Sequence, residues 1–163
     1  MERNLYLNKL IRKKNNGLIK VITGIRRSGK TYLLFELFYD YLIKSGVDKD
    51  HIIKIALDDR INKKYRDPDI LCEYVHDVVK DDQIYYVLLD EVQMVSEFED
   101  VLNSFLHMKN VDTYVTGSNA KFLSKDIITE FRGRGDQVHL FPLSFAEYMS
   151  GKGIDRQQAW QEY

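Results

Sequence analysis

The stretch GIRRSGKT at residues 24–31 decides the fold class of this 163-residue chain. It fits the pattern G-x-x-x-x-G-K-[ST] and lies between two segments with different periodicity. The preceding run IKVITGI (19–25) is short, apolar and rich in β-branched residues, whereas TYLLFELFYDYLIK (31–44) has the apolar spacing of a buried helix. A strand, a glycine-rich loop and a helix in this order form a phosphate-binding loop. The sequence therefore predicts a phosphate site here.

The chemistry expected of this loop follows from its residue types. Two glycines let the backbone curl so that successive amide N–H groups point at a phosphate, and the helix N-terminus adds partial positive charge. Lys30 supplies a full charge to the β- and γ-phosphates, and Thr31 offers a hydroxyl to Mg²⁺. The predicted nucleotide-binding residues are those of the whole loop: Gly24, Ile25, Arg26, Arg27, Ser28, Gly29, Lys30 and Thr31.

A second motif, YYVLLDE at 85–91, is an apolar strand that ends in two acidic residues. The carboxyl ends of parallel strands lie at one edge of a sheet, so Asp90 and Glu91 are expected beside the phosphate loop. We expect Asp90 to hold Mg²⁺ through water and Glu91 to polarise the water that attacks the γ-phosphate. An apolar run that ends in two acids is by itself more often only the end of a strand. The phosphate loop earlier in the chain makes a functional interpretation of this acidic pair much stronger. No NKxD guanine-reading motif is present, which disfavours a GTPase.

Two further segments contain candidate catalytic residues. TGSN (116–119) ends another strand in polar residues, and Asn119 is a candidate sensor of the γ-phosphate, while Ser118 is better explained as a helix cap. EFRGRGD (130–136) places Arg132 and Arg134 among glycines. We favour Arg134 as a guanidinium that neutralises transition-state charge, although an ordinary solvated loop and a helix-terminal role for Arg132 stay open.

The remaining periodicity predicts alternating strands and helices. Parallel pairing with helices on both faces follows, because a parallel crossover needs a dozen or more residues. This is a three-layer α/β fold with five strands. Strands are expected at 19–25, 51–57, 84–89, 111–118 and 136–141.

Cap signals predict where several helices begin. Asp67 and Pro68 open a helix with Leu71, Tyr74, Val75 and Val78 as its buried face, and Ser96 with Glu99 forms a capping box. A weaker helix is expected over 121–131, and Ser144 with Glu147 forms another capping box. The basic run RINKKYR at 60–66 is expected to be a solvated loop.

Composition limits the classes of function. There are 24 basic and 25 acidic residues, for a net charge of −1, so no chain-wide field attracts nucleic acid or anionic lipid. The single cysteine cannot form an internal disulfide, and the four histidines are too dispersed for a local metal-ligand pair. Long apolar runs are interrupted by charges, so we expect a cytoplasmic protein without a membrane anchor.

Four segments together resemble a known family: GIRRSGKT, YYVLLDEVQ (85–93), YVTGSNAKFLS (114–124) and TEFRGRGDQVHLFPLSFAEY (129–148). They are similar to the prokaryotic AAA-type P-loop ATPases, an archaeal-ATPase-like core that usually carries a C-terminal domain of unknown function. The resemblance implies an ATP-binding domain at 1–150 with the AAA-like sheet order 5-1-4-3-2. Residues 151–163 would begin a following helical segment of a longer protein.

The resemblance also implies the activity and the partners. We expect Mg²⁺-dependent ATP binding and hydrolysis, with Lys30 and Thr31 as phosphate and Mg²⁺ residues and Asp90 and Glu91 as the acidic pair. The alternative is a nucleotide-gated switch or interaction module that binds ATP with little turnover. A second copy of the chain or another protein is the expected partner, and a nucleic-acid motor would need a basic face.

Overall fold

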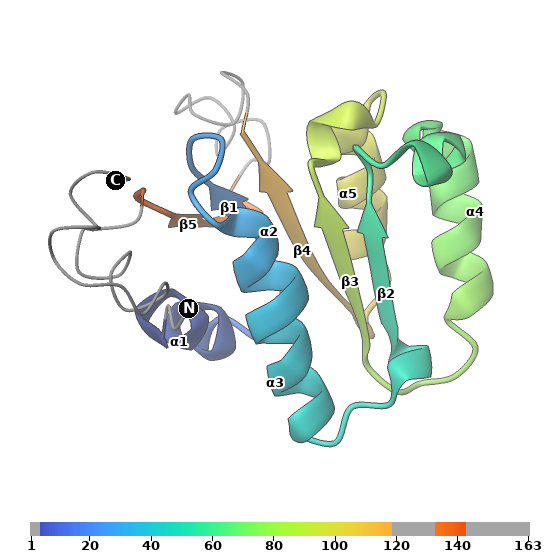
Figure 1. Ribbon diagram of the computed structural model, residues 1–163. Coiled ribbons are helices and arrows are strands. Elements are labelled where there is room, and N and C mark those ends of the chain that lie inside the picture. Colours follow the sequence, from blue (N-terminus) through green and yellow to red (C-terminus); the bar gives the residue numbers. More distant parts are fainter. Residues whose placement is uncertain (1–3, 119–132, 143–163) are drawn as a thin grey trace, which may run out of the picture.

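The computed structural model describes residues 4–118 and 133–142 (Figure 1). Its helices and strands follow in the order α1 (Asn4–Arg12), β1 (Ile19–Thr23), α2 (Lys30–Tyr32), η1 (Leu33–Phe38), α3 (Tyr39–Lys44), η2 (Lys49–His51), β2 (Ile52–Ala56), η3 (Arg60–Arg66), α4 (Pro68–Val78), β3 (Tyr85–Asp90), η4 (Val92–Met94), α5 (Phe98–Leu106), β4 (Val111–Gly117) and β5 (Gly135–His139). The predicted helix over 121–131 and the predicted capping box at Ser144 lie outside the described residues.

The five strands form one parallel sheet in the order β2-β3-β4-β1-β5 (Figure 1). This is the predicted order 5-1-4-3-2 read from the other edge, so the predicted fold class is confirmed. Every residue of β1 and β3 is buried, as expected for strands covered on both faces. The parallel direction brings the segments after β1, β3 and β4 to the same edge of the sheet, where the loop and the acidic pair were predicted.

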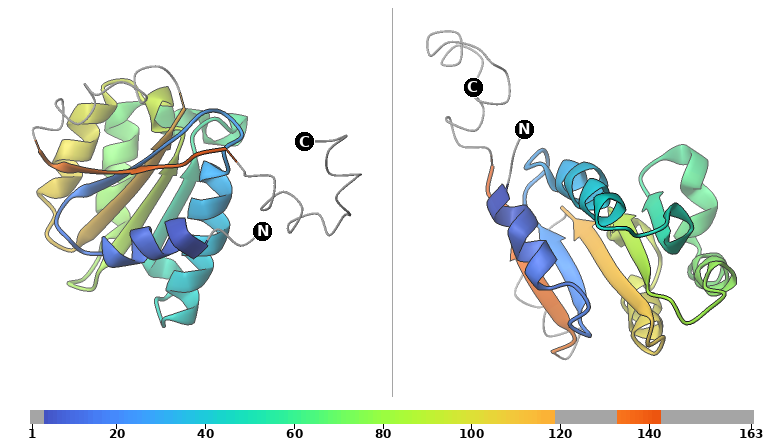
Figure 2. Two further views of the ribbon diagram at one scale, coloured as in Figure 1. Left: turned by 90° about the vertical axis from the view of Figure 1, so that its left-hand side faces the viewer. Right: turned by 90° about the horizontal axis from the view of Figure 1, so that it is seen from below.

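Helices cover both faces of the sheet and give three layers (Figure 2). Alternate residues of β3 point to opposite faces. Val87 and Leu89 pack with α4 and α5, whereas Tyr86 and Leu88 pack with α1 and with the helix formed by α2, η1 and α3. The sheet thus separates two apolar cores.

The helix after the phosphate loop runs without a break from α2 through η1 to α3. Its polar stripe of Glu36, Asp40 and Lys44 is exposed, as the four-residue spacing predicts. The middle part, η1, is a π-helix, which apolar spacing alone did not indicate. Beyond α3, Gly46 has a φ of 99°, which suits a residue without a side chain at a helix C-terminus.

One capping box predicted from the sequence is wrong. Helix α5 begins at Phe98, one residue later than a Ser96 cap requires, and the side chain of its N-cap residue makes no capping hydrogen bond. The residue before the helix is Glu97, in a left-handed conformation with φ 54°. The backbone N–H of Ser96 donates to the carbonyl of Arg66, 3.2 Å away, which ties the segment before α5 to the end of η3. The apolar face predicted for this helix is nevertheless buried.

Two other expectations needed correction. Tyr74 was predicted on the buried face of α4 but is 36% exposed, and its ring lies against Tyr65 with centroids 4.9 Å apart. The segment 60–66, expected to be a solvated loop, forms the 3-10 helix η3. Its last residue, Arg66, donates to the carbonyl of Leu57 at 2.8 Å, which ties η3 to the end of β2.

Candidate nucleotide-binding site

Both glycines of the loop 24–31 lie where a side chain would either clash with neighbouring atoms or strain the backbone. A Cβ at Gly24 would lie 2.7 Å from the backbone oxygen of Leu140 and 2.7 Å from the Oγ of Ser28, so no side chain fits there. Gly29 has a φ of 93°, which side chains rarely allow, and the helix begins directly after it. The loop therefore turns tightly at the carboxyl end of β1 and leads into α2.

The side chain of Lys30 is folded into this loop. Only 4% of Lys30 is exposed, and its Nζ donates to the carbonyl oxygens of Ile25 at 2.8 Å and Gly24 at 3.0 Å. Burial lowers the pKa of Lys30, and this effect is opposed by the negative charges of Glu91 and Asp90. The ammonium group is thus a poorly solvated cation between the loop and the acidic pair.

The carboxylate of Asp90 is buried at this edge and accepts hydrogen bonds from two threonine hydroxyls. Asp90 is 3% exposed, and each of its carboxylate oxygens lies 3.0 Å from the Thr31 hydroxyl. The hydroxyl of Thr116, at the end of β4, donates to the same carboxylate at 2.6 Å. Burial raises the pKa of Asp90, the bonds from Thr116 and Thr31 oppose this, and the charges of Glu91 and Asp58 raise it further. Thr31 and Asp90 are therefore in contact, and Thr116 joins them without having been predicted.

Glu91 is turned away from Asp90 by its backbone. Its φ of 55° is left-handed, and its N–H donates to the Thr116 hydroxyl at 2.9 Å. Its carboxylate accepts hydrogen bonds from the amide of Gln93 and from the hydroxyl of Ser118, which lies 3.0 Å from Oε2 and 3.2 Å from Oε1. Neighbouring carboxylates thus have separate environments: one faces two threonines, the other a serine and a glutamine.

The oxygen groups at this edge fit a magnesium ion that also binds phosphate. Among the described residues, no group of three or more histidines, cysteines or acids could hold a metal by itself. Mg²⁺ commonly keeps several waters and takes one or two protein oxygens together with phosphate oxygens. The Thr31 hydroxyl and the Asp90 carboxylate are hard oxygen ligands of this kind.

The structure does not bring Arg134 to this site. The backbone oxygen of Arg134 accepts from the N–H of Ile19, the first residue of β1, at 2.8 Å. Arg134 is exposed and lies at the amino edge of the sheet, about 15 Å of strand away from the loop. A role of Arg134 toward a neighbouring molecule stays a prediction. Asn119 and Arg132 lie outside the described residues.

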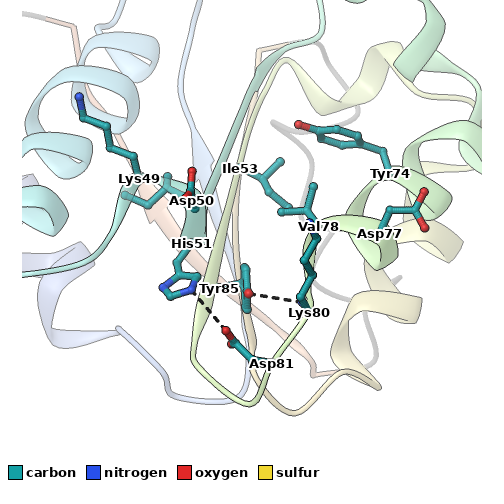
Figure 3. A pocket seen from close by; sticks show the side chains of 11 residues that line it. Lys49, Asp50, His51, Ile53, Tyr74, Asp77, Val78, Lys80, Asp81 and Tyr85 are labelled. Carbon is teal, nitrogen blue, oxygen red and sulfur yellow. Dashed lines mark hydrogen bonds and ion pairs between the residues drawn. The ribbon is translucent and has the colours of Figure 1, made fainter.

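A separate depression of about 640 Å³ opens at the same amino edge, beside β2 and α4 (Figure 3). Its lining mixes charges: His51 Nε2 lies 3.7 Å from Asp81, and Lys80 donates its backbone N–H to the Tyr85 hydroxyl at 3.3 Å. None of the predicted site residues lines it. In the described part of the chain, no helix is long and apolar enough to cross a membrane.

The parallel sheet, the loop after β1 and the acidic pair after β3 define a P-loop NTPase fold. Comparison with known families agrees with this class. A model of the AAA domain matches residues 16–149, and the chain belongs to this family. The predicted family resemblance is confirmed.

Two curated relatives are uncharacterized proteins. One, from Haemophilus influenzae, is 33% identical over 158 residues, which are 96% of this chain and 39% of the relative. The other, from Methanocaldococcus jannaschii, is 32% identical over 141 residues, 84% of this chain and 29% of the relative. The chain thus spans less than half the length of these relatives.

Solved structures of low sequence identity share the fold. A DNA polymerase III gamma subunit-related protein from Thermotoga maritima has a TM-score of 0.65 at 13% identity, covering 99% of this chain and 52% of that one. AMPPCP-bound DnaA from Aquifex aeolicus has a TM-score of 0.58 at 14% identity, covering 95% and 52%. These similarities establish the architecture alone.

Proposed function

We propose that this AAA domain binds ATP with Mg²⁺ and hydrolyses it as part of a larger protein. The observation that carries the proposal is the meeting of Lys30, Thr31, Asp90 and Glu91 at one edge of the sheet, beside a loop that excludes a side chain at Gly24. These groups supply a cation, two hard oxygen ligands and a base, which are the parts that phosphoryl transfer to water requires.

Binding of the phosphates begins with the loop and Lys30. The loop leads into a continuous helix over residues 30–44, whose N-terminus favours an anion. Lys30 exchanges its bonds to the Gly24 and Ile25 carbonyls for bonds to phosphate oxygens. Because the ammonium is already stripped of most of its water, it loses little further hydration when a phosphate arrives.

Thr31 and Asp90 would hold the Mg²⁺ ion. When bound, the ion neutralises charge on the β- and γ-phosphates. Asp90 is suited to this because burial raises its pKa, so a nearby cation relieves the cost of its ionisation. The bond between Thr31 and Asp90 already holds the two oxygen ligands side by side.

Glu91 is the base in the hydrolytic step. Its carboxylate accepts a proton from water while the water oxygen bonds to the γ-phosphorus and the bond to the β-phosphate oxygen breaks, leaving ADP and phosphate. Its left-handed backbone aims it away from Asp90, so one acid serves the metal and the other the water.

A second candidate is an ATP-gated switch with little turnover. It is favoured by the hydrogen bonds that Ser118 and Gln93 already make to the Glu91 carboxylate, which restrain the base. The chain also spans less than half of its curated relatives, so a partner segment that releases the base can lie elsewhere in the protein.

Turnover by the Glu91→Gln variant tests the proposal. The amide keeps the size of the side chain but cannot take the proton, so turnover should fall on the order of 10² to 10⁴-fold while the ATP-induced rise in melting temperature remains. The matched control is Glu36→Gln, on the exposed stripe of the helix, which should leave turnover unchanged. Turnover of Glu91→Gln within a few-fold of the parent assigns the base elsewhere. ATP binding without turnover in the parent supports the switch.

A further inference from the structure

We propose that Gln93 is a positioning residue, which holds the Glu91 carboxylate with its amide nitrogen in the orientation that proton transfer from water requires. This inference rests on the proposed hydrolysis. The amide Nε2 of Gln93 donates to Glu91 Oε2. The Oε1 of the same amide is buried and accepts no hydrogen bond from the described residues. The contact with the base is therefore made by the amide nitrogen.

The backbone fixes the direction of the Gln93 side chain. The 3-10 helix η4 closes with bonds from Met94 N to Glu91 O and from Val95 N to Val92 O, both 3.0 Å long. In a 3-10 helix, residues three apart lie on one side. Val92 and Val95 are 1% and 2% exposed and anchor that side in the apolar core, so Gln93 is held on another side, toward Glu91.

The hydrogen bonds around Glu91 are distributed unequally over its two carboxylate oxygens. Gln93 and Ser118 both approach Oε2, and the Ser118 hydroxyl lies closer to Oε2, at 3.0 Å, than to Oε1, at 3.2 Å. Oε1 is thus the carboxylate oxygen with the greater remaining capacity to accept a proton. A carboxylate oxygen accepts bonds from two or more donors, so Oε1 can bind water despite the weak contact to Ser118.

A carboxylate held in this way is positioned to take a proton from water. Gln93 restrains Oε2 with its amide nitrogen, which leaves Glu91 Oε1 to accept the proton that is transferred. Methionine has a similar size but no donor, so it removes this restraint and keeps the bulk of the side chain.

The experiment compares Gln93→Met with a control of the same kind. Asn103 on α5 also has a buried amide oxygen with no partner among the described residues, but it has no hydrogen bond to the acidic pair, so Asn103→Leu is matched. Gln93→Met should lower kcat on the order of 10²-fold with the ATP Kd within twofold, because a misplaced catalytic group costs about that much. Asn103→Leu should keep the parent kcat. In a Glu91→Gln background, Gln93→Met should cause no further loss in single-turnover rate, since both changes remove one function.

Gln93→Asn provides a second variant if the methionine disturbs folding. It keeps the amide but retracts both of its atoms by one methylene, so it should lower kcat as well without changing ATP binding. The inference is overturned if Gln93→Met and Gln93→Asn turn over like Asn103→Leu while Glu91→Gln is inactive, a result that leaves the proposed hydrolysis intact. It is equally overturned if the losses of Glu91→Gln and Gln93→Met multiply, or if ATP binding falls with kcat. A parent that binds ATP without turnover removes the proposed hydrolysis and the role of Gln93 together.

Discussion

Replacing Thr116 by valine should destabilise the protein through two hydrogen bonds at once. The buried hydroxyl donates to Asp90 at 2.6 Å and accepts from the Glu91 N–H at 2.9 Å, and valine has the same shape without either bond. A bond to a charged group contributes about 1.5 to 3 kcal/mol, and an orphaned N–H costs about 1 to 3 kcal/mol. Because the two bonds share one atom, we expect a combined loss of about 3 kcal/mol in the free energy of unfolding. For a domain of this size that corresponds to a melting temperature lower by roughly 6 to 12 °C.

The loss should depend on pH in a defined direction. Burial raises the pKa of Asp90 in the folded state, and the Thr116 bond opposes that rise. The protein therefore loses stability as the pH rises above the pKa that Asp90 has in the unfolded chain, because the folded state disfavours the ionised carboxylate. This loss is larger in Thr116→Val, in which the hydroxyl no longer stabilises the carboxylate. The stability difference between Thr116→Val and the parent should be smallest in acid, where Asp90 is protonated, and should grow toward neutral pH.

Thermal unfolding of Thr116→Val beside Thr113→Val measures this effect. Thr113 lies on the same strand, is 3% exposed, and its side chain makes no hydrogen bond to the described residues. The same substitution there should change stability by less than about 1 kcal/mol. Equal melting temperatures for the two variants at neutral pH would refute the reasoning, as would a deficit of Thr116→Val that grows in acid.

Two further changes address the loop and the sheet. Gly24→Ala should cost about 1 to 3 kcal/mol, because its Cβ meets the Leu140 backbone oxygen, and it should lose the melting-temperature rise with Mg²⁺-ATP. The control is Gly46, which has a φ of 99° and open space around it, so Gly46→Ala should strain the backbone but keep the rise with Mg²⁺-ATP. A normal ATP response in Gly24→Ala would contradict the loop geometry. Lys20→Met should cost about 3 to 5 kcal/mol in chemical denaturation, because Asp112, its partner in a buried ion pair between β1 and β4, is left uncompensated. Lys20→Met with Asp112→Leu should recover part of that loss, and a single variant as stable as the parent would show that the pair contributes little.

The fold was predictable because the pattern of strands and helices is local. Apolar runs, glycine breaks and the cap at Asp67 and Pro68 identify the elements, and the Asp67 side chain does accept from the N–H of Asp69 at 2.9 Å. The order of the strands came from the family resemblance, because spacing alone does not say which strands are neighbours. Helix α1 was missed although Leu7, Leu10 and Ile11 have helical spacing, since the charged residues around them obscure the pattern.

The main parts of the candidate site were predictable from two motifs, and its supporting residues were not. Thr116 belongs to the segment TGSN, in which the residue types indicated Ser118 and Asn119 and not the threonine. Its contact with Asp90 depends on β3 and β4 lying side by side in one register, with Leu89 opposite Val115. Register between distant segments leaves no local mark in a single sequence, so the contact of Ser118 with Glu91 was not predictable either.

The melting temperature with and without Mg²⁺-ATP, in the parent and in Lys30→Ala, tests the central claim most directly. A ligand at 100 times its Kd stabilises the folded state by about 2.7 kcal/mol, or roughly 5 to 11 °C for a chain of this length. Lys44→Ala, an exposed lysine at the far end of the same continuous helix, is the matched control. We predict the full rise in the parent and in Lys44→Ala and none in Lys30→Ala. An equal rise in Lys30→Ala would contradict the nucleotide site at this loop.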